Sequence, residues 1–173
     1  MKVELLKVPT AEEWMEVKRR ALVTIGKAPV SPPDEKWKRA MLRARHSPIR
    51  FLTFSFLIEC PYWVAMHLVR HHVGIQPFVR SQRNDRQDDY DREAAPQGAP
   101  VTMILDVNAE ALITLANKRL CGQASEETQQ LVGMMCELAK RECPEFTPEL
   151  VPMCIRNGGM CHEMKPCGRY GRV

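Results

Sequence analysis

Long hydrophobic runs are missing from this sequence of 173 residues. A membrane-spanning helix needs about 18 or more predominantly apolar residues in succession. The densest apolar stretch, residues 51–69, is interrupted by Glu59, Pro61 and His67. The first residues, MKVELLKVPT, contain no apolar segment of the kind found in secretory signals. We therefore expect a cytoplasmic protein with no membrane partner.

Internal repeats and low-complexity tracts are also missing, which excludes collagen-like, coiled-coil and disordered classes. The excess of positive charge is small, with a formal net charge of +4 at pH 7. The basic residues in the middle of the chain are mostly arginine, which suits phosphate ligands because a guanidinium group donates two parallel hydrogen bonds to phosphate oxygens. The excess is too small to indicate a nucleic-acid partner. By itself, the charge indicates an ordinary solvated surface.

Hydrophobic spacing and capping residues predict five helices and two strands. The helices are expected over residues 11–25, 34–44, 61–72, 109–121 and 125–142, and the strands over 50–59 and 101–106. Asp34, Asn108 and Ser125 are typical N-cap residues at three of the helix starts. Residues 73–85 have an irregular polar pattern, and residues 85–100 are charged and then rich in proline and glycine. We therefore expect an exposed connection there.

Cysteine is abundant, and the odd number of seven prevents a complete set of disulfides within one chain. Without an export signal, reduced thiols or a metal site fit better than disulfides. Cys60, Cys121 and Cys136 have apolar neighbours in the sequence, so we expect them in the core. The other four gather near the C-terminus, where we separate a cysteine-rich tail, residues 151–173, from a domain over residues 1–150.

The tail carries Cys154, Cys161 and Cys167, and cysteine is a usual zinc ligand. One hypothesis is a structural zinc held by these three cysteines, with Cys143 or His162 as the fourth ligand. The spacing differs from the common C-x2-C, and the adjacent Cys161 and His162 cannot easily bind one ion together. Free thiols are the leading alternative, and a disulfide is the other.

A first cluster of polar residues follows the apolar stretch. His67, Arg70 and His71 have the spacing of one helix face, and His72 follows them. The next segment adds Arg80, Ser81 and Arg83 from a loop. These residues indicate an anion pocket built from a helix end and a loop. Alternatively, the cations only complement the negative end of a helix dipole.

A second cluster lies on the helix expected after Asn108, and it contains Thr114, Lys118 and Arg119. Arg119 has the spacing of the apolar stripe formed by Leu112 and Leu115. An arginine on an apolar stripe needs either an anionic partner or a route for its guanidinium group to water. The two alternatives are therefore a ligand contact and an ordinary surface arginine.

Taken in order, these motifs resemble those of the flavin-dependent thymidylate synthases, also called thymidylate-synthase-complementing proteins. The family signature is RHRxxSxNExSxRY. Residues 70–72 read RHH and match its opening, with histidine for the second arginine. Residues 81–84 read SQRN and match its SxRY end, with asparagine for tyrosine. Residues 47–51, SPIRF, resemble the family's S/T-P-x-E-H, which precedes a strand. Residues 108–112, NAEAL, resemble its NaRsL, and Ala124 with Glu127 resembles its AQWE. The resemblance covers about residues 46–145.

The chain departs from the family pattern at several positions. Arg50-Phe51 replace Glu-His, and Glu110 stands where the family has an arginine. The interval from Arg70 to Arg83 is one residue longer than in the signature. The long insert that the family usually has between Arg83 and Asn108 is nearly absent.

The resemblance implies an α/β (α+β) fold in which helices pack on a small, mostly antiparallel sheet. It also implies a site for FAD and a site for dUMP. The FAD residues would be Ser47, Arg70, His71, His72, Asn108, Thr114 and Lys118. The dUMP residues would be His67, Arg70, Ser81, Gln82, Arg83 and Arg119. Lys118-Arg119 resemble the family's leucine-arginine pair. Arg119 would also be catalytic, since the matching arginine in the family polarises the pyrimidine without any protein nucleophile.

The activity implied is the methylation of dUMP to dTMP, a step of nucleotide biosynthesis that uses methylenetetrahydrofolate and NADPH. The family forms homotetramers with active sites between subunits, so we expect self-association. Two alternatives remain. One is a related flavoenzyme that acts on another pyrimidine nucleotide. The other is a non-enzymatic module that binds nucleotide or nucleic acid and carries a zinc-binding tail.

Overall fold

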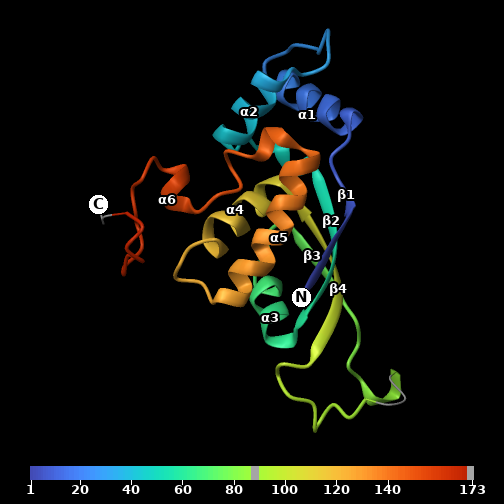
Figure 1. The fold of residues 1–173 in the computed structure, drawn as a ribbon. Coiled ribbons are helices and arrows are strands. Elements are labelled where there is room, and N and C mark those ends of the chain that lie inside the picture. The colour runs from blue at the N-terminus through green and yellow to red at the C-terminus, as the bar shows by residue number, and fades with distance from the viewer. Residues whose placement is uncertain (87–89, 171–173) are drawn as a thin grey trace.

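A computed structural model describes residues 1–86 and 90–170 of the chain. Its centre is a four-stranded antiparallel sheet in the order β1-β2-β4-β3 (Figure 1). The strands are β1 (Lys2–Lys7), β2 (Thr53–Pro61), β3 (Ile75–Val79) and β4 (Pro100–Asn108). Helices cover one face of this sheet. The α/β fold with a small antiparallel sheet, expected from the sequence, is confirmed.

The two central strands supply the sheet side of the core. In β2, Phe54, Phe56 and Ile58 are fully buried, and they alternate with partly exposed residues. Strand β4 alternates in the same way, as expected for strands with one buried face. The strand predicted over residues 50–59 starts later, because residues Ser47–Phe51 form a short 3-10 helix, η1. The strand predicted over residues 101–106 is longer at both ends and spans Pro100–Asn108.

Strands β1 and β3 form the two edges of the sheet, and neither was predicted. The irregular polar pattern of residues 73–85 hides β3, in which Ile75 is buried opposite Val107 while Gln76 and Phe78 are exposed. Pro77 is tolerated in β3 because an edge strand needs only some of its N–H groups for pairing. Edge strands are often short or polar in sequence. They can therefore be recognised only once the neighbouring strand with which they pair is known.

Three helices cover the sheet: α3 (Tyr62–Val69), α4 (Ala109–Arg119) and α5 (Glu126–Glu142). Two more, α1 (Ala11–Val23) and α2 (Glu35–Ala44), lie at one end of the molecule (Figure 1). The expected caps at Asp34 and Asn108 are confirmed by side-chain hydrogen bonds. The Ser125 hydroxyl instead donates to Thr128 Oγ1 over 2.8 Å. None of the helices in the described part of the chain is long and apolar enough to cross a membrane.

Helix α3 ends at Val69, three residues before the predicted end. Arg70 is its C-cap, and His71 and His72 lie in the connection to β3. The prediction that His67, Arg70 and His71 share a helix face is therefore wrong. The connection at 85–100 contains turns and the short helix η2 (Asn84–Arg86), and residues 87–89 of it lie outside the described residues.

After α5 the chain packs back against α2 and α4. It forms the short helices η3 (Pro144–Phe146) and α6 (Met153–Arg156), and the described part of the tail ends at residue 170. Phe146 is fully buried, and its ring meets the edge of Phe54 at 5.1 Å between centroids. A buried polar residue, Asn117, holds this segment by donating to the carbonyl oxygens of Glu149 (3.0 Å) and Val151 (2.6 Å).

Candidate functional site

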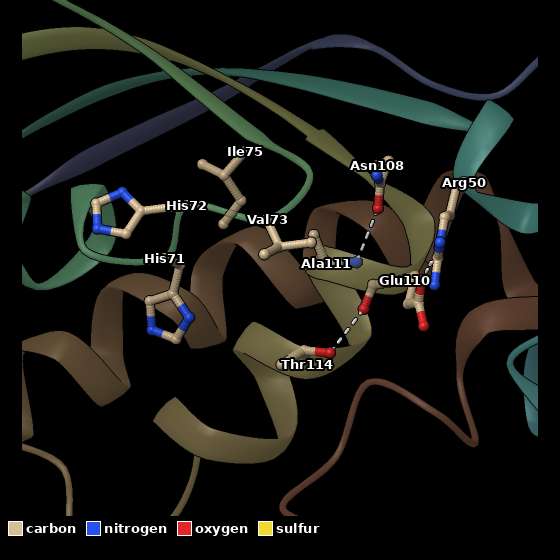
Figure 2. Close-up of a pocket in the computed structure, with 9 residues that line it drawn as sticks. All are labelled: Arg50, His71, His72, Val73, Ile75, Asn108, Glu110, Ala111 and Thr114. Atoms are coloured by element: carbon tan, nitrogen blue, oxygen red, sulfur yellow. Dashed lines mark hydrogen bonds and ion pairs between the residues drawn. The ribbon is translucent and has the colours of Figure 1, made fainter. Parts of the chain in front are cut away.

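One pocket lies where η1, the segment before β3 and the start of α4 meet, and its volume is about 350 Å³. We call it the α4 pocket. Figure 2 shows its lining: Arg50, His71, His72, Val73, Ile75, Asn108, Glu110, Ala111 and Thr114. Of the seven residues predicted to hold FAD, the pocket brings together His71, His72, Asn108 and Thr114. Ser47, Arg70 and Lys118 lie outside its lining.

Asn108 fixes the start of α4 at the pocket wall. It is the last residue of β4, and its side-chain Oδ1 accepts a hydrogen bond from the Ala111 N–H over 2.9 Å. Its own N–H donates to the carbonyl oxygen of Gly74 over 2.9 Å. Gly74 has a φ of +76°, and an added Cβ there would lie 2.3 Å from the Asn108 amide nitrogen. Glycine at position 74 is therefore required for this close approach.

An ion pair and two histidines lie on opposite sides of the α4 pocket. On one side Arg50 Nε donates to Glu110 Oε2, which joins η1 to the first turn of α4. His71 and His72 lie on the other side (Figure 2). Burial, and then the charges of Arg119 and His72, lower the pKa of His71. His71 is therefore mainly neutral at pH 7, and its Nε2 can accept a hydrogen bond.

The Arg119 guanidinium lies beside His71. Its Nε donates to His71 Nε2 over 3.0 Å, and its Nη2 is 3.4 Å from the carbonyl oxygen of His67. His67 in turn is bonded through Nδ1 to Thr128 Oγ1 at 2.8 Å. Arg119 is thus half-buried and tied to the end of α3.

Arg119 also borders a second hollow of about 320 Å³, which His71, Lys118, Cys121, Gln123 and Glu163 help to line. Lys118 forms an ion pair with Glu163 of the tail at 3.6 Å. Ser81 and Gln82 line a different and smaller hollow of about 70 Å³. Arg83 is exposed and pairs with Asp85 over 2.7 Å. The six residues predicted to hold dUMP are therefore not gathered in one pocket of a single chain.

The predicted zinc ligands divide between the core and a separate pocket. Cys143 is buried in the core, whereas Cys154, Cys161 and Cys167 line a separate pocket with Cys121. Within residues 1–86 and 90–170, no group of three or more His, Cys, Asp or Glu side chains is placed to hold a metal ion. Three cysteines were expected in the core. Cys60 and Cys136 are buried, but Cys121 is only half-buried.

Thiol reactivity provides a direct check of this arrangement. Burial raises the pKa of Cys60 to about 11 and those of Cys136 and Cys143 to about 12. Because the thiolate is the reactive species, iodoacetamide at pH 8 should modify the exposed Cys167 first and leave these three intact in the folded protein. Peptide mass spectrometry in buffer and in urea would measure this. Native labelling of Cys136 as fast as that of Cys167 would contradict the expectation.

Sequence reasoning missed the participation of Arg50 and Glu110 in the α4 pocket. The available signal was the departure of both residues from the family motif. Sequence reasoning also missed the contact between His71 and Arg119, because 48 positions separate them.

Comparison with known proteins agrees with this architecture. The family model for thymidylate synthase complementing protein matches residues 84–145. Among solved structures, the UMP/dUMP methylase PolB from Streptomyces cacaoi, bound with 5-Br dUMP, superposes with a TM-score of 0.67. The sequences are 16% identical, and the match covers 87% of this chain and 96% of PolB. None of the curated proteins matches the sequence. The resemblance to this family is confirmed.

Proposed function

We propose that this protein, which resembles the thymidylate-synthase-complementing family in sequence and fold, methylates a pyrimidine deoxynucleotide and converts dUMP to dTMP. Methylenetetrahydrofolate would supply the carbon and NADPH the reducing equivalents. The observation that carries the proposal is the contact of Arg119 with His71. This contact places the proposed catalytic arginine beside the α4 pocket, where four of the proposed flavin residues lie together.

The α4 pocket has donors that suit part of a flavin dinucleotide. Arg50 and His72 are exposed and can donate to phosphate oxygens, while Asn108 and Thr114 add polar groups. We therefore assign FAD to this pocket, with His71, His72, Asn108 and Thr114 as contacts. FAD, when bound, would supply the redox chemistry that the side chains lack.

The size of the pocket favours self-association. A volume of about 350 Å³ is near the lower end of the roughly 300–1,000 Å³ found for ligand sites. One chain therefore does not enclose FAD and a nucleotide together. A second copy would supply the remaining walls, and it would bring Ser81, Gln82 and Arg83 closer to Arg119 than they lie in one chain. We therefore propose a homotetramer with sites between subunits.

Arg119 is the residue to which we assign activation of the pyrimidine. Its guanidinium group carries a fixed positive charge, and the bond to His71 fixes its direction. A cation held beside the uracil carbonyl oxygen and N3 stabilises negative charge that develops on the ring. Because the pKa of His71 is lowered, His71 remains an acceptor for Arg119 and adds no competing positive charge.

A second candidate is a related methylase with a different pyrimidine preference. It is favoured by the segment 75–83, which departs from the family motif and forms β3 and the hollow lined by Ser81 and Gln82. PolB, whose fold is similar, is described as a UMP/dUMP methylase. Discrimination between ribose and deoxyribose therefore has to be measured.

The test is a spectral titration of the purified protein with FAD, followed by isothermal titration with dUMP, UMP and dCMP. We expect a shifted flavin spectrum, preferential binding of dUMP, and a tetramer by light scattering. Tight binding of UMP instead of dUMP would favour the second candidate. A folded oligomer that binds a nucleotide but no flavin would overturn both enzyme assignments and favour a binding module.

A further inference from the structure

Two departures from the family motif meet in the α4 pocket. Arg50 stands where the family has a glutamate, and Glu110 stands where it has an arginine. The two positions are 60 residues apart in the sequence, yet Arg50 Nε donates to Glu110 Oε2. Relative to the family motif, the acidic and the basic residue have therefore exchanged positions. Either departure alone would bring two like charges together, which is unfavourable.

We propose that this exchanged pair makes Arg50 the phosphate-binding cation of the α4 pocket, with Glu110 as the residue that positions it. The ligand group is a phosphate of the flavin dinucleotide, so the inference rests on the proposed function. The binding cation would come from η1, whereas the arginine in the family motif lies at the start of the helix.

The exposure of the two side chains supports this division of roles. The Arg50 side chain is 59% exposed and the Glu110 side chain 25% exposed. The carboxylate is therefore shielded, while the guanidinium group presents further N–H donors to solvent and to a ligand. Among the described residues, the bond of Arg50 to Glu110 uses only Nε, so its two terminal nitrogens can make the paired hydrogen bonds that arginine makes with phosphate.

The position of Glu110 also fits a supporting role. It is the second residue of α4, where a negative charge interacts favourably with the helix dipole. The Asn108 side chain caps the same turn through the Ala111 N–H, so the carboxylate stands on a fixed backbone. Across the pocket, the lowered pKa of His71 leaves it mainly neutral. Arg50 is thus the lining residue with a permanent positive charge.

A purely structural role explains the pair less well. Exposed ion pairs contribute little to stability. Arg39 and Glu35 on α2 form such a pair outside the pocket, with side chains 51% and 63% exposed. That pair provides a matched control, because it has the same chemistry without a neighbouring cavity.

The test measures FAD, FMN and dUMP affinity by fluorescence and calorimetric titration for the wild type, R50A, R50K, R50E, R39A and the double exchange R50E/E110R. Far-UV circular dichroism and melting temperature would verify folding. We expect R50A to weaken FAD binding about tenfold or more and to reduce its salt dependence, because a charge-assisted hydrogen bond is lost. R50K should lose less, R39A should match the wild type, and R50E/E110R should recover part of the binding that R50E alone loses.

Failure of this inference differs from failure of the proposed function. FAD binding by R50A within twofold of the wild type would overturn the role of Arg50 and leave the flavoenzyme assignment intact. Weaker dUMP binding with unchanged FAD binding would overturn the assignment of the phosphate to flavin. A wild-type protein that takes up no flavin would overturn both proposals.

Discussion

Replacing Arg119 with alanine should weaken dUMP binding about 10- to 150-fold, which corresponds to a loss of ~1.5–3 kcal/mol for a charge-assisted contact. Turnover should fall further, because the contact strengthens as the pyrimidine ring becomes anionic. R119K should rescue binding only in part, since lysine keeps the charge but lacks the planar fork. The measurements are calorimetric titration with dUMP and NADPH oxidation in the presence of methylenetetrahydrofolate.

A second readout distinguishes this role from a merely structural one. Arg119 lowers the pKa of His71, so the R119A variant should show a higher His71 pKa in an NMR titration. FAD affinity should change less than twofold, because the flavin contacts are assigned to other side chains. Arg141, an exposed arginine on α5, provides the control variant R141A. Wild-type dUMP affinity and turnover in R119A would show that Arg119 does not act on the nucleotide.

The largest expected effect on stability is that of Asn117→Ala, which we expect to lower the free energy of unfolding by about 3–4 kcal/mol. Asn117 is fully buried, and its amide nitrogen donates to the carbonyl oxygens of Glu149 and Val151. Its Oδ1 accepts from Arg45 Nη2. Alanine would leave two carbonyl groups and a guanidinium group without these partners. The bond to Glu149 is buried and the other two are part-buried, and an unpaired buried group costs roughly 1–3 kcal/mol. Urea unfolding followed by tryptophan fluorescence would measure the change.

Arg45 makes this site especially sensitive. It is the C-cap of α2 with a φ of +49°, and its Nε has no hydrogen-bond partner within the described residues. Losing Asn117 would leave its guanidinium group with the contact to Thr114 Oγ1 at 3.3 Å. Asn157, a half-buried residue after α6, provides the control Asn157→Ala, which should change stability by less than about 1 kcal/mol. Equal losses in the two variants would contradict the role given to Asn117.

The sequence by itself determined the elements that depend on local interactions. Helix starts were predicted correctly at Asp34 and Asn108, because an N-cap side chain bonds to backbone two or three residues away. The strand β2 could also be predicted from local sequence, because neighbouring side chains of a strand point to opposite faces of the sheet and buried residues therefore alternate with exposed ones. The ordered motifs also identified the family resemblance and four of the residues that line the α4 pocket.

Only the tertiary structure decided the features that depend on distant partners. Strands β1 and β3 exist because β2 and β4 offer free edges, which no local pattern reveals. The helix predicted to reach residue 72 stops at Val69, so that His71 can meet Arg119 from α4. The pairing of Arg50 with Glu110 likewise needs η1 and α4 to lie side by side. Such contacts form only when the chain brings distant residues together. The residues involved could therefore be named from the sequence, but their distances and orientations could not be predicted from it.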